Sequence, residues 1–314
     1  MSRAPAALSP ATVAASETVP SRRGAARRAW LIALRGQIPV IVVAVAIVVL
    51  WYGAGLYSDY PFARQIAAPG ASFGQVLRSA LNLPSPFVPL PHQVLNDFFT
   101  ALAQPFDSPR GLWIHMEATG VEALLGLLIG AAVGMLIATV FVYSRPLENA
   151  FLPYVVASQT VPVLALAPIV IGLFGITLTA KVVVAAYLAF FSVTVSAVKG
   201  FKSADPLARE LMRSYAASRW QIYRKLLFPV ALPYLFTGLK IGATASLVGA
   251  IIAELPFGSA TGLGARLLIA TTYDETIAWW STMLAASVLG IVAFGAISGL
   301  ERLVVRGRPD SVGG

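Results

Sequence analysis

Residues 203–233 read SADPLARELMRSYAASRWQIYRKLLFPVALP, a polar and basic stretch between two hydrophobic segments that could each enter a membrane. Asp205 followed by Pro206 is typical of a helix N-cap with proline at the first helical position. Ser218 with Gln221 three residues later has the spacing of a capping box, which predicts a second helix start. Pro229 and Pro233 are expected to punctuate the entry into the next hydrophobic run. The stretch therefore predicts two short amphipathic helices on a loop between membrane spans, the alternative being a solvated interfacial loop with helical propensity.

The composition is that of an integral membrane protein. Of 314 residues, 57% are hydrophobic and 12% are charged, and the mean hydropathy is +0.76, far outside the range of soluble proteins. The absence of cysteine excludes a disulfide framework, thiolate chemistry and cysteine-ligated zinc. A net charge of +9 could suit a nucleic-acid partner, but in a membrane chain basic residues more often set topology. We therefore expect contact with membrane lipid and no nucleic-acid partner.

Hydrophobic runs predict an all-α membrane protein with about six transmembrane helices. About 20 apolar residues are needed to cross a bilayer core as a helix. Suitable runs cover residues 38–57, 120–143, 149–180, 181–198, 232–253 and 276–300. The expected domains are a disordered basic tail at 1–36, a first transmembrane helix at 37–57, an extracytoplasmic linker at 58–115, a core of five transmembrane helices at 116–304 that contains the loop 203–228, and a second tail at 305–314.

Two local patterns refine this organisation. Gly126, Gly130 and Gly134 recur at every fourth position of one span, and such small-residue stripes in lipid usually mark a helix-packing face. In the linker, prolines between residues 84 and 91 exclude a regular helix throughout. Residues 92–99 after them predict a short amphipathic helix on the outer surface.

The basic residues are distributed asymmetrically across the predicted spans. With the N-terminus inside, the inner segments hold six in the first tail, one at Arg145, seven between Lys199 and Lys225, and three in the last tail. The outer segments hold four. The excess places the loop 203–228 and both termini in the cytoplasm by the positive-inside rule.

The loop resembles the cytoplasmic coupling loop of bacterial ABC importer permeases, whose pattern is E-A-A, three residues, G, nine residues, I-x-L-P. Glu210 takes the acidic position, Ala216 the glycine position and Pro229 the proline position. Residues 217–222, ASRWQI, and 229–234, PVALPY, are closer to the nitrate/sulfonate/taurine-type subfamily, in which GASRWQI and LPAALPY are typical. The chain is thus identified as a member of this binding-protein-dependent transport family from about residue 84 to residue 302.

The resemblance implies a type I ABC importer permease fold in the bacterial inner membrane. Two copies, in a homodimer, would form the translocation path, a cytoplasmic ATPase carrying ATP and Mg²⁺ would dock on the coupling loop, and an extracytoplasmic solute-binding protein would deliver substrate. This chain itself would bind no cofactor. The residues expected to couple to the ATPase are Glu210, Arg213, Ala216, Ser218, Arg219, Trp220 and Pro229.

The uncharged run at 149–180, which Pro153, Pro162 and Pro168 are expected to break, is the best candidate for the pathway wall. Irregular backbone at membrane depth is tolerated only where it is buried in protein or lines a cavity. Residues 158–168 resemble the ALQAIPPLALAPL segment of the same permeases. Gln159 could bind substrate or a neighbouring helix, and Lys240 could line the path or snorkel to the interface. The pathway candidates are Gln159, Thr160, Pro162, Lys240 and Glu254, the last resembling the acidic residue that closes the equivalent helix in the family.

The sequence favours transport over catalysis. It has no Walker A pattern, and His92 and His115 belong to no metal-ligand motif, so we expect no catalytic residue and no metal site. The substrate stays open between a nitrate-, sulfonate-, taurine- or bicarbonate-like anion and a pyrimidine- or flavin-type vitamin precursor. The segments 254–258, ELPFG, and 262–264, GLG, resemble members linked to the latter. The alternative function is a non-transporting membrane scaffold that docks a cytoplasmic partner through its basic loop.

Overall fold

The computed structural model describes residues 22–255 and 259–305, with side chains from residue 38 onward. Predictions that fall on residues 1–21, 256–258 and 306–314 lie outside the described residues: these are most of the basic tail, the PFG of the ELPFG segment and nearly all of the second tail. The chain divides into two compact units, residues 1–54 and 55–314. All packing described below lies within the second unit.

Helices are the only regular secondary structure in the described residues, as predicted. Five helices are long and apolar enough to cross a membrane, and a bent pair of shorter helices raises the number to six if it counts as one span. The five are Ile38–Ile66, Trp113–Tyr143, Leu178–Lys202, Arg219–Glu254 and Thr276–Val304. The first lies in α1 (Arg22–Ile66), so this helix begins inside the range predicted for the tail and continues beyond residue 57.

The linker folds into two short helices joined by the proline-rich segment. They are α2 (Phe73–Leu81) and α3 (Pro91–Leu102). The helix predicted at residues 92–99 is confirmed by α3, which buries Val94, Phe98 and Ala101. The other faces of α3 stay polar or exposed, as expected for an amphipathic helix.

Helix α7 (Leu178–Lys202) packs between α4 (Trp113–Tyr143) and α10 (Phe228–Glu254) and forms the centre of the core. The glycine stripe of α4 faces α7. A Cβ on Gly130 would lie 2.7 Å from the carbonyl oxygen of Ala186, and one on Gly134 would lie 2.7 Å from that of Phe190. Only glycine permits this approach, so the predicted packing face is confirmed.

The predicted pathway run folds as a sharply bent pair of helices. Helix α5 (Arg145–Ala157) and the 3₁₀ turn η1 (Ser158–Thr160) meet α6 (Val163–Phe174) at 97°. The bend lies before α6, which Pro162 caps, and Gly175 ends α6 with φ 74°. Pro153 and Pro168 were also expected to break the run, but both lie inside helices.

The basic loop contains α8 (Pro206–Ser214) and α9 (Arg219–Ile222), followed by the π-helical turn η2 (Tyr223–Leu227). The helix runs on without a break from α9 through η2 into α10. Pro229 and Pro233, expected to punctuate the entry into the span, instead lie in the first turn and in the interior of α10. Pro229 has no N–H to donate to the preceding turn. The π-helical turn just before it has a wider hydrogen-bond spacing than an α-helix, so the backbone pairing changes at this point.

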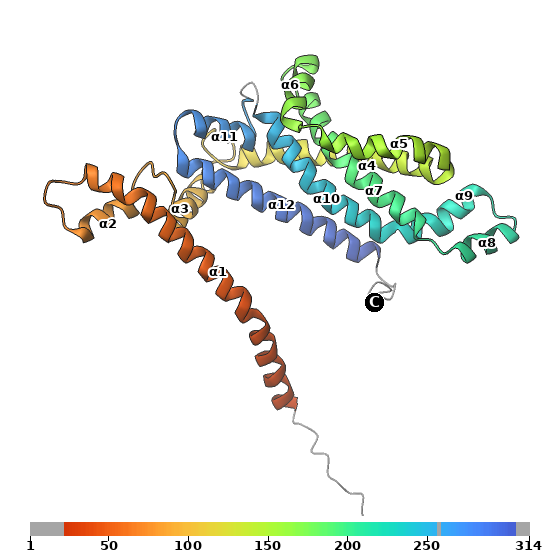
Figure 1. Cartoon of the computed structure of the whole chain (residues 1–314), viewed down its shortest axis with the longest axis horizontal. Helices are drawn as coiled ribbons and strands as arrows, with labels where there is room; N and C mark the ends of the chain where they lie inside the picture. The colour runs from red at the N-terminus through yellow and green to blue at the C-terminus, as the bar shows by residue number, and fades with distance from the viewer. Residues whose placement is uncertain (1–21, 256–258, 306–314) are drawn as a thin grey trace, which may run out of the picture. The chain divides into compact units, whose positions relative to one another are not determined.

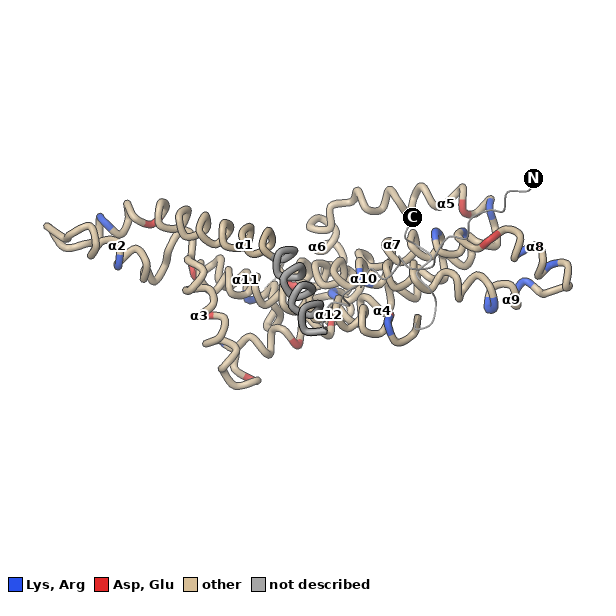
Figure 2. Tube along the Cα trace, turned by 90° about the horizontal axis from the view of Figure 1, so that it is seen from below, with Lys and Arg blue, Asp and Glu red and all other residues tan. Residues whose placement is uncertain are grey.

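The two ends of the core carry different elements. Helices α8 and α9 lie at one end, and α3 with α11 (Leu263–Thr272) lies at the other, where α12 (Thr276–Val304) begins (Figure 1). Lys and Arg gather around α8 and α9 (Figure 2). By the positive-inside rule we refer to the α8–α9 end as the inner end and to the α3–α11 end as the outer end.

Candidate functional site

Both predicted helix starts in the basic loop are confirmed. The Asp205 carboxylate accepts a hydrogen bond from the backbone N–H of Leu207 at 2.9 Å, with Pro206 in the first turn of α8. The Ser218 hydroxyl accepts from the N–H of Gln221 at 3.2 Å, and the Gln221 side chain accepts from the N–H of Ser218 at 2.7 Å. Each cap binds backbone donors that a helix start would otherwise leave unpaired.

The turn between α8 and α9 is a Schellman motif with alanine where glycine is usual. The N–H of Ala217 donates to the carbonyl of Met212, and the N–H of Ala216 donates to that of Arg213. Ala216 has φ 54°, in the left-handed region. The family pattern places glycine at this position. The chain departs from the pattern where a side chain destabilises the backbone, because a left-handed conformation is unfavourable for residues other than glycine.

Aromatic contacts hold the loop against α4. Trp220 stacks on Tyr223 with ring centroids 5.6 Å apart, and the Tyr223 hydroxyl lies 3.1 Å from that of Thr139. The Tyr143 hydroxyl donates to the backbone carbonyl of Arg219 at 3.1 Å. These contacts with Thr139 and Tyr143 therefore hold the loop against the core.

Six of the seven predicted coupling residues lie exposed on this loop, namely Glu210, Arg213, Ala216, Ser218, Arg219 and Trp220. Pro229 does not join them, because it is half-buried within α10. The loop also exposes apolar side chains on α8 and just after it: Leu207 is 73% exposed and Tyr215 80%. Exposed apolar side chains beside basic ones form a surface suited to a protein partner.

The pathway candidates of the broken run lie at the α5–α6 bend. Gln159, Thr160 and Pro162 are all exposed in the single chain. The Tyr187 hydroxyl of α7 donates to the carbonyl of Ser158, which ties the bend to the core. Their place on a pathway stays a prediction.

Glu254 is completely buried and joins three helices at the outer end. Its carboxylate accepts from the Thr119 hydroxyl of α4 at 2.7 Å and from the backbone N–H of Gly264 of α11 at 2.5 Å. Gly262, with φ 123°, packs directly against it. We call this arrangement the Glu254 clasp. Its hydrogen bonds are made inside the subunit, which gives Glu254 a structural task besides its predicted place on the pathway.

A buried ion pair beside the clasp was missed from the sequence. The Lys181 ammonium of α7 lies 2.6 Å from the Glu122 carboxylate of α4 and donates to the Ser259 hydroxyl at 2.8 Å. Both charged side chains are buried, and they line a cavity of about 610 Å³. Glu122 inside a predicted span was the available signal, since intramembrane ionisable residues are usually paired and functional.

Lys240, the other cation within a predicted span, is also paired. Its ammonium lies 2.5 Å from the Glu301 carboxylate of α12 and 5.5 Å from the centre of the Phe294 ring. This pairing compensates the charge that would have favoured an anion in the pathway.

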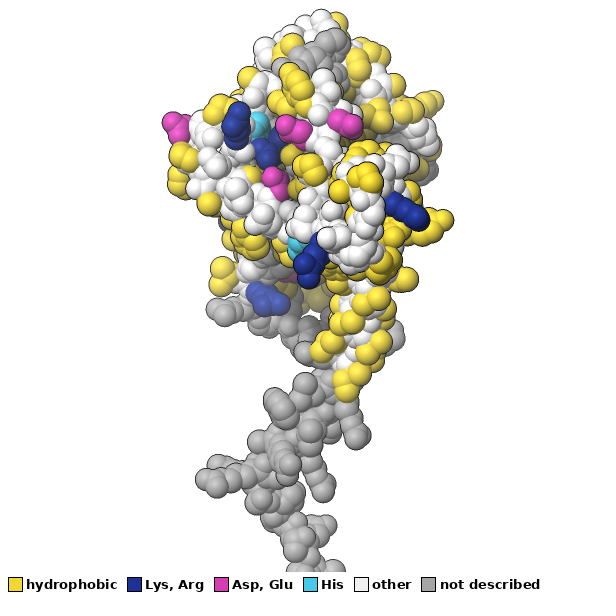
Figure 3. All heavy atoms as spheres, turned by 90° about the vertical axis from the view of Figure 1, so that its left-hand side faces the viewer, with side chains coloured by type: hydrophobic (Ala, Val, Ile, Leu, Met, Phe, Trp, Pro, Cys, Tyr) yellow, Lys and Arg dark blue, Asp and Glu magenta, His cyan; other side chains and the backbone are white. Residues whose placement is uncertain are grey.

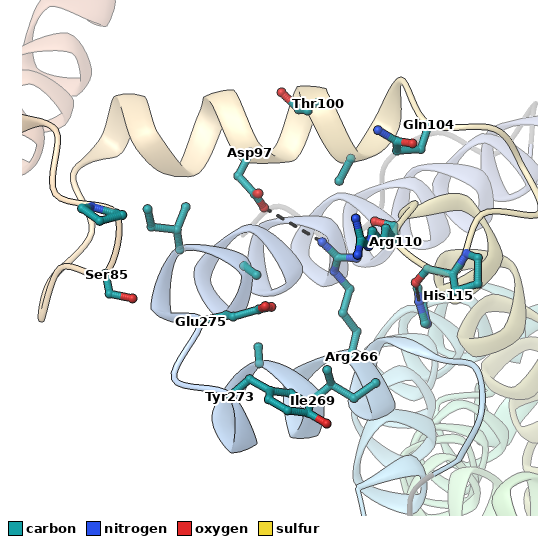
Figure 4. A pocket seen from close by; sticks show the side chains of 16 residues that line it. Ser85, Asp97, Thr100, Gln104, Arg110, His115, Arg266, Ile269, Tyr273 and Glu275 are labelled. Atoms are coloured by element: carbon teal, nitrogen blue, oxygen red, sulfur yellow. Dashed lines mark hydrogen bonds and ion pairs between the residues drawn. The ribbon is translucent and has the colours of Figure 1, made fainter.

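A second cavity of about 670 Å³ opens at the outer end, where acidic and basic side chains lie among apolar ones (Figure 3). Arg266 reaches into it (Figure 4). It donates to the Thr282 hydroxyl at 3.0 Å and to the Arg110 carbonyl at 2.8 Å, and lies 4.0 Å from the Asp97 carboxylate. Burial lowers the pKa of Arg266, and the charges of Asp97 and Glu275 oppose that shift. The cavity has a mixed polar and apolar lining, and the guanidinium of Arg266 is already bonded within it.

Comparison with known proteins gives one consistent assignment. The model of the family described as "Binding-protein-dependent transport system inner membrane component" matches residues 130–307. The chain is 34% identical to the formylaminopyrimidine transport permease protein of Halalkalibacterium halodurans, over 61% of this chain and 76% of that protein. It is 32% identical to the riboflavin transport system permease protein of Chloroflexus aurantiacus, over 71% and 81%. It is 29% identical to the taurine transport system permease protein of Escherichia coli, over 80% and 92%.

Proposed function

Since the chain belongs to the binding-protein-dependent transport system inner membrane component family, and is thus a permease subunit of an ABC importer, we propose that its α8–α9 loop docks the partner ATPase. The observation that carries this proposal is the loop surface itself. It is exposed, basic and aromatic, and its caps and ring contacts hold it in one conformation. A preorganised surface loses little conformational entropy when a partner binds.

Within this surface, we assign the largest share of docking energy to Trp220. Exposed aromatic side chains become hot spots when a partner pocket buries them. Arg213 and Arg219 are exposed cations, and Glu210 an exposed anion, that can form charge-assisted hydrogen bonds around it. Leu207 and Tyr215 extend the apolar part of the surface.

Docking would move the core because α9 is continuous with a membrane span. The helix from Arg219 to Glu254 carries the loop at its inner end and the Glu254 clasp at its outer end. Ile222 and Leu227 are buried with Phe201 of α7, so the loop and two spans share one apolar cluster. Movement of the bound ATPase is thereby passed to α7 and α10 together, which supports alternation between inward-open and outward-open states.

The remaining partners follow from the family. A solute-binding protein would deliver substrate at the outer end, and two copies of this chain would form the path. ATP and Mg²⁺ would be held by the ATPase. Among the residues that the structure describes, no group of three or more His, Asp or Glu could hold a metal ion. The relatives' names cover nitrogen heterocycles and a sulfonate, so the solute class depends on features of this chain.

The test measures the affinity of the co-purifying ATPase for the permease in nanodiscs. Trp220→Ala should weaken binding roughly 30-fold, which corresponds to a hot-spot loss of about 2 kcal/mol. Glu210→Ala should reduce ATP hydrolysis stimulated by a loaded binding protein. Asp107→Ala, which removes an exposed carboxylate at the end of the core opposite the loop, is the control for ATPase affinity and should leave that affinity unchanged.

Equal ATPase affinity for the wild type and Trp220→Ala would remove the docking proposal. If the ATPase binds but no loaded binding protein stimulates hydrolysis or uptake, the scaffold function predicted as the alternative would replace transport.

A further inference from the structure

The cavity beside the Lys181–Glu122 pair has the size and lining of a small-molecule site. Its volume of about 610 Å³ falls within the range typical of ligand pockets. It lies at the outer end, between the first turns of α4, the start of α7 and the segment that precedes α11. Its polar lining residues are Glu117, Glu122, Thr177, Lys181, Ser259 and Thr261.

The buried pair gives this cavity both donors and acceptors. The Lys181 ammonium has three N–H groups, and its contacts with Glu122 and Ser259 use two of them. The third can donate to an acceptor on a bound molecule. Because the pair is buried from bulk water, such a bond would be stronger than one at the surface.

The charges around the cavity are not balanced. Lys181 is compensated by Glu122, whereas the exposed Glu117 carboxylate has no cation beside it among the described residues. Glu254 lies behind the pair and is bonded to a hydroxyl and a backbone N–H, not to a cation. Among the residues that line the cavity, the charges of Lys181, Glu122 and Glu117 sum to one negative charge, which would repel an anion.

The other walls are apolar. Val121 of α4, Ile176 just before α7 and Leu178 at the start of α7 line the cavity, and all three side chains are exposed in the single chain. Apolar side chains together with a few polar groups suit a ring with polar substituents.

We propose that this cavity binds the transported solute, and that it selects a neutral or protonated nitrogen heterocycle with an amino group over a nitrate-like or sulfonate anion. The amino group would donate to Glu117 or Glu122, and a ring nitrogen would accept from Lys181. This inference rests on the proposed transport function. It chooses between the two solute classes named by the relatives on the charge of the cavity.

The experiment measures direct binding to the purified permease in nanodiscs, without ATPase or binding protein. The probes are 4-aminopyrimidine, methanesulfonate and nitrate. Their binding is measured by equilibrium dialysis and saturation-transfer NMR. 4-Aminopyrimidine should bind, and neither anion should bind or displace it. Glu117→Gln should weaken 4-aminopyrimidine binding about tenfold, as expected when an amine loses a charged acceptor.

Two further variants test whether 4-aminopyrimidine binds in this cavity and not elsewhere. Ala118→Phe should fill the cavity from α4 and abolish binding, while its unfolding temperature shows that the fold is kept. Glu275→Gln removes an exposed carboxylate from the other outer cavity and should leave binding unchanged. Tighter binding of either anion than of 4-aminopyrimidine, or unchanged binding in both Glu117→Gln and Ala118→Phe, would overturn the proposal.

The two proposals fail separately. ATPase affinity and its response to Trp220→Ala do not depend on Glu117, so loss of the solute site with ATPase docking intact would refute only the cavity proposal. The reverse result would refute only the docking proposal.

Discussion

At the scale of single residues, the α8–α9 loop shows how closely local chemistry follows the sequence. Asp205 and Ser218 cap the helices that their neighbours predict, because each bond spans only a few residues. Ala216 is the exception. It occupies a left-handed position that the family pattern gives to glycine, and the Schellman bonds around it hold it there.

Ala216→Gly should therefore stabilise the loop. A left-handed conformation costs a non-glycine residue roughly 1–2 kcal/mol, and glycine loses about 0.5–1 kcal/mol more entropy on ordering. The net gain is about 0.5–1 kcal/mol, which should slow local hydrogen exchange of the α8–α9 amides. Ala216→Val is the control and should speed exchange, because a β-branched side chain fits this region poorly. Faster exchange in Ala216→Gly would contradict the account.

At the scale of elements, the approach of α4 to α7 depends on glycine. The sequence predicted the packing face from spacing alone, and the structure supplied the partner helix. The expectation that Pro153, Pro168 and Pro233 break helices was wrong, because all three lie inside helices. Neighbouring helices and local adjustments can satisfy the carbonyls that proline leaves unbonded.

Gly130→Ala should destabilise the permease by roughly 1–3 kcal/mol, because the added methyl group would collide with the backbone of α7. The measurement is the unfolding temperature of the purified protein, followed by tryptophan fluorescence. Gly120→Ala lies on the same helix, where the nearest atom, Leu289 Cδ1, is 3.7 Å from the new Cβ. This control should be neutral or slightly stabilising. Equal behaviour of the two variants would show that α4 and α7 do not pack closely at Gly130.

At the scale of the whole molecule, α8 and α9 lie at one end of the core and α3 and α11 at the other (Figures 1 and 2), in agreement with the charge asymmetry of the sequence. The absence of cysteine from the chain allows a direct test of this topology. In intact spheroplasts, a membrane-impermeant maleimide should label Asp107→Cys and should label Ser214→Cys only after lysis. The opposite pattern would place α8 and α9 outside the cell and exclude their docking of a cytoplasmic ATPase.

The sequence by itself determined the helical spans, the helix caps and the short helices of the loop, and it predicts the topology. These follow from hydropathy, from hydrogen bonds between near neighbours and from the position of charge relative to each span. The resemblance to the family placed the seven expected coupling residues on or beside this loop, and six of them are exposed there; their contact with an ATPase stays a prediction.

Only the tertiary structure decided which group each buried charged side chain bonds to. Lys181 pairs with Glu122, Lys240 with Glu301, and Glu254 with Thr119 and Gly264, although most of these partners are more than 50 residues apart in the chain. A buried charge needs a partner, but hydropathy does not reveal which one, because the choice depends on the faces that α4, α7, α10 and α12 turn toward one another. The packing of the helices thus places a carboxylate beside each of Lys181 and Lys240. The cavity beside Lys181 keeps one uncompensated carboxylate, that of Glu117.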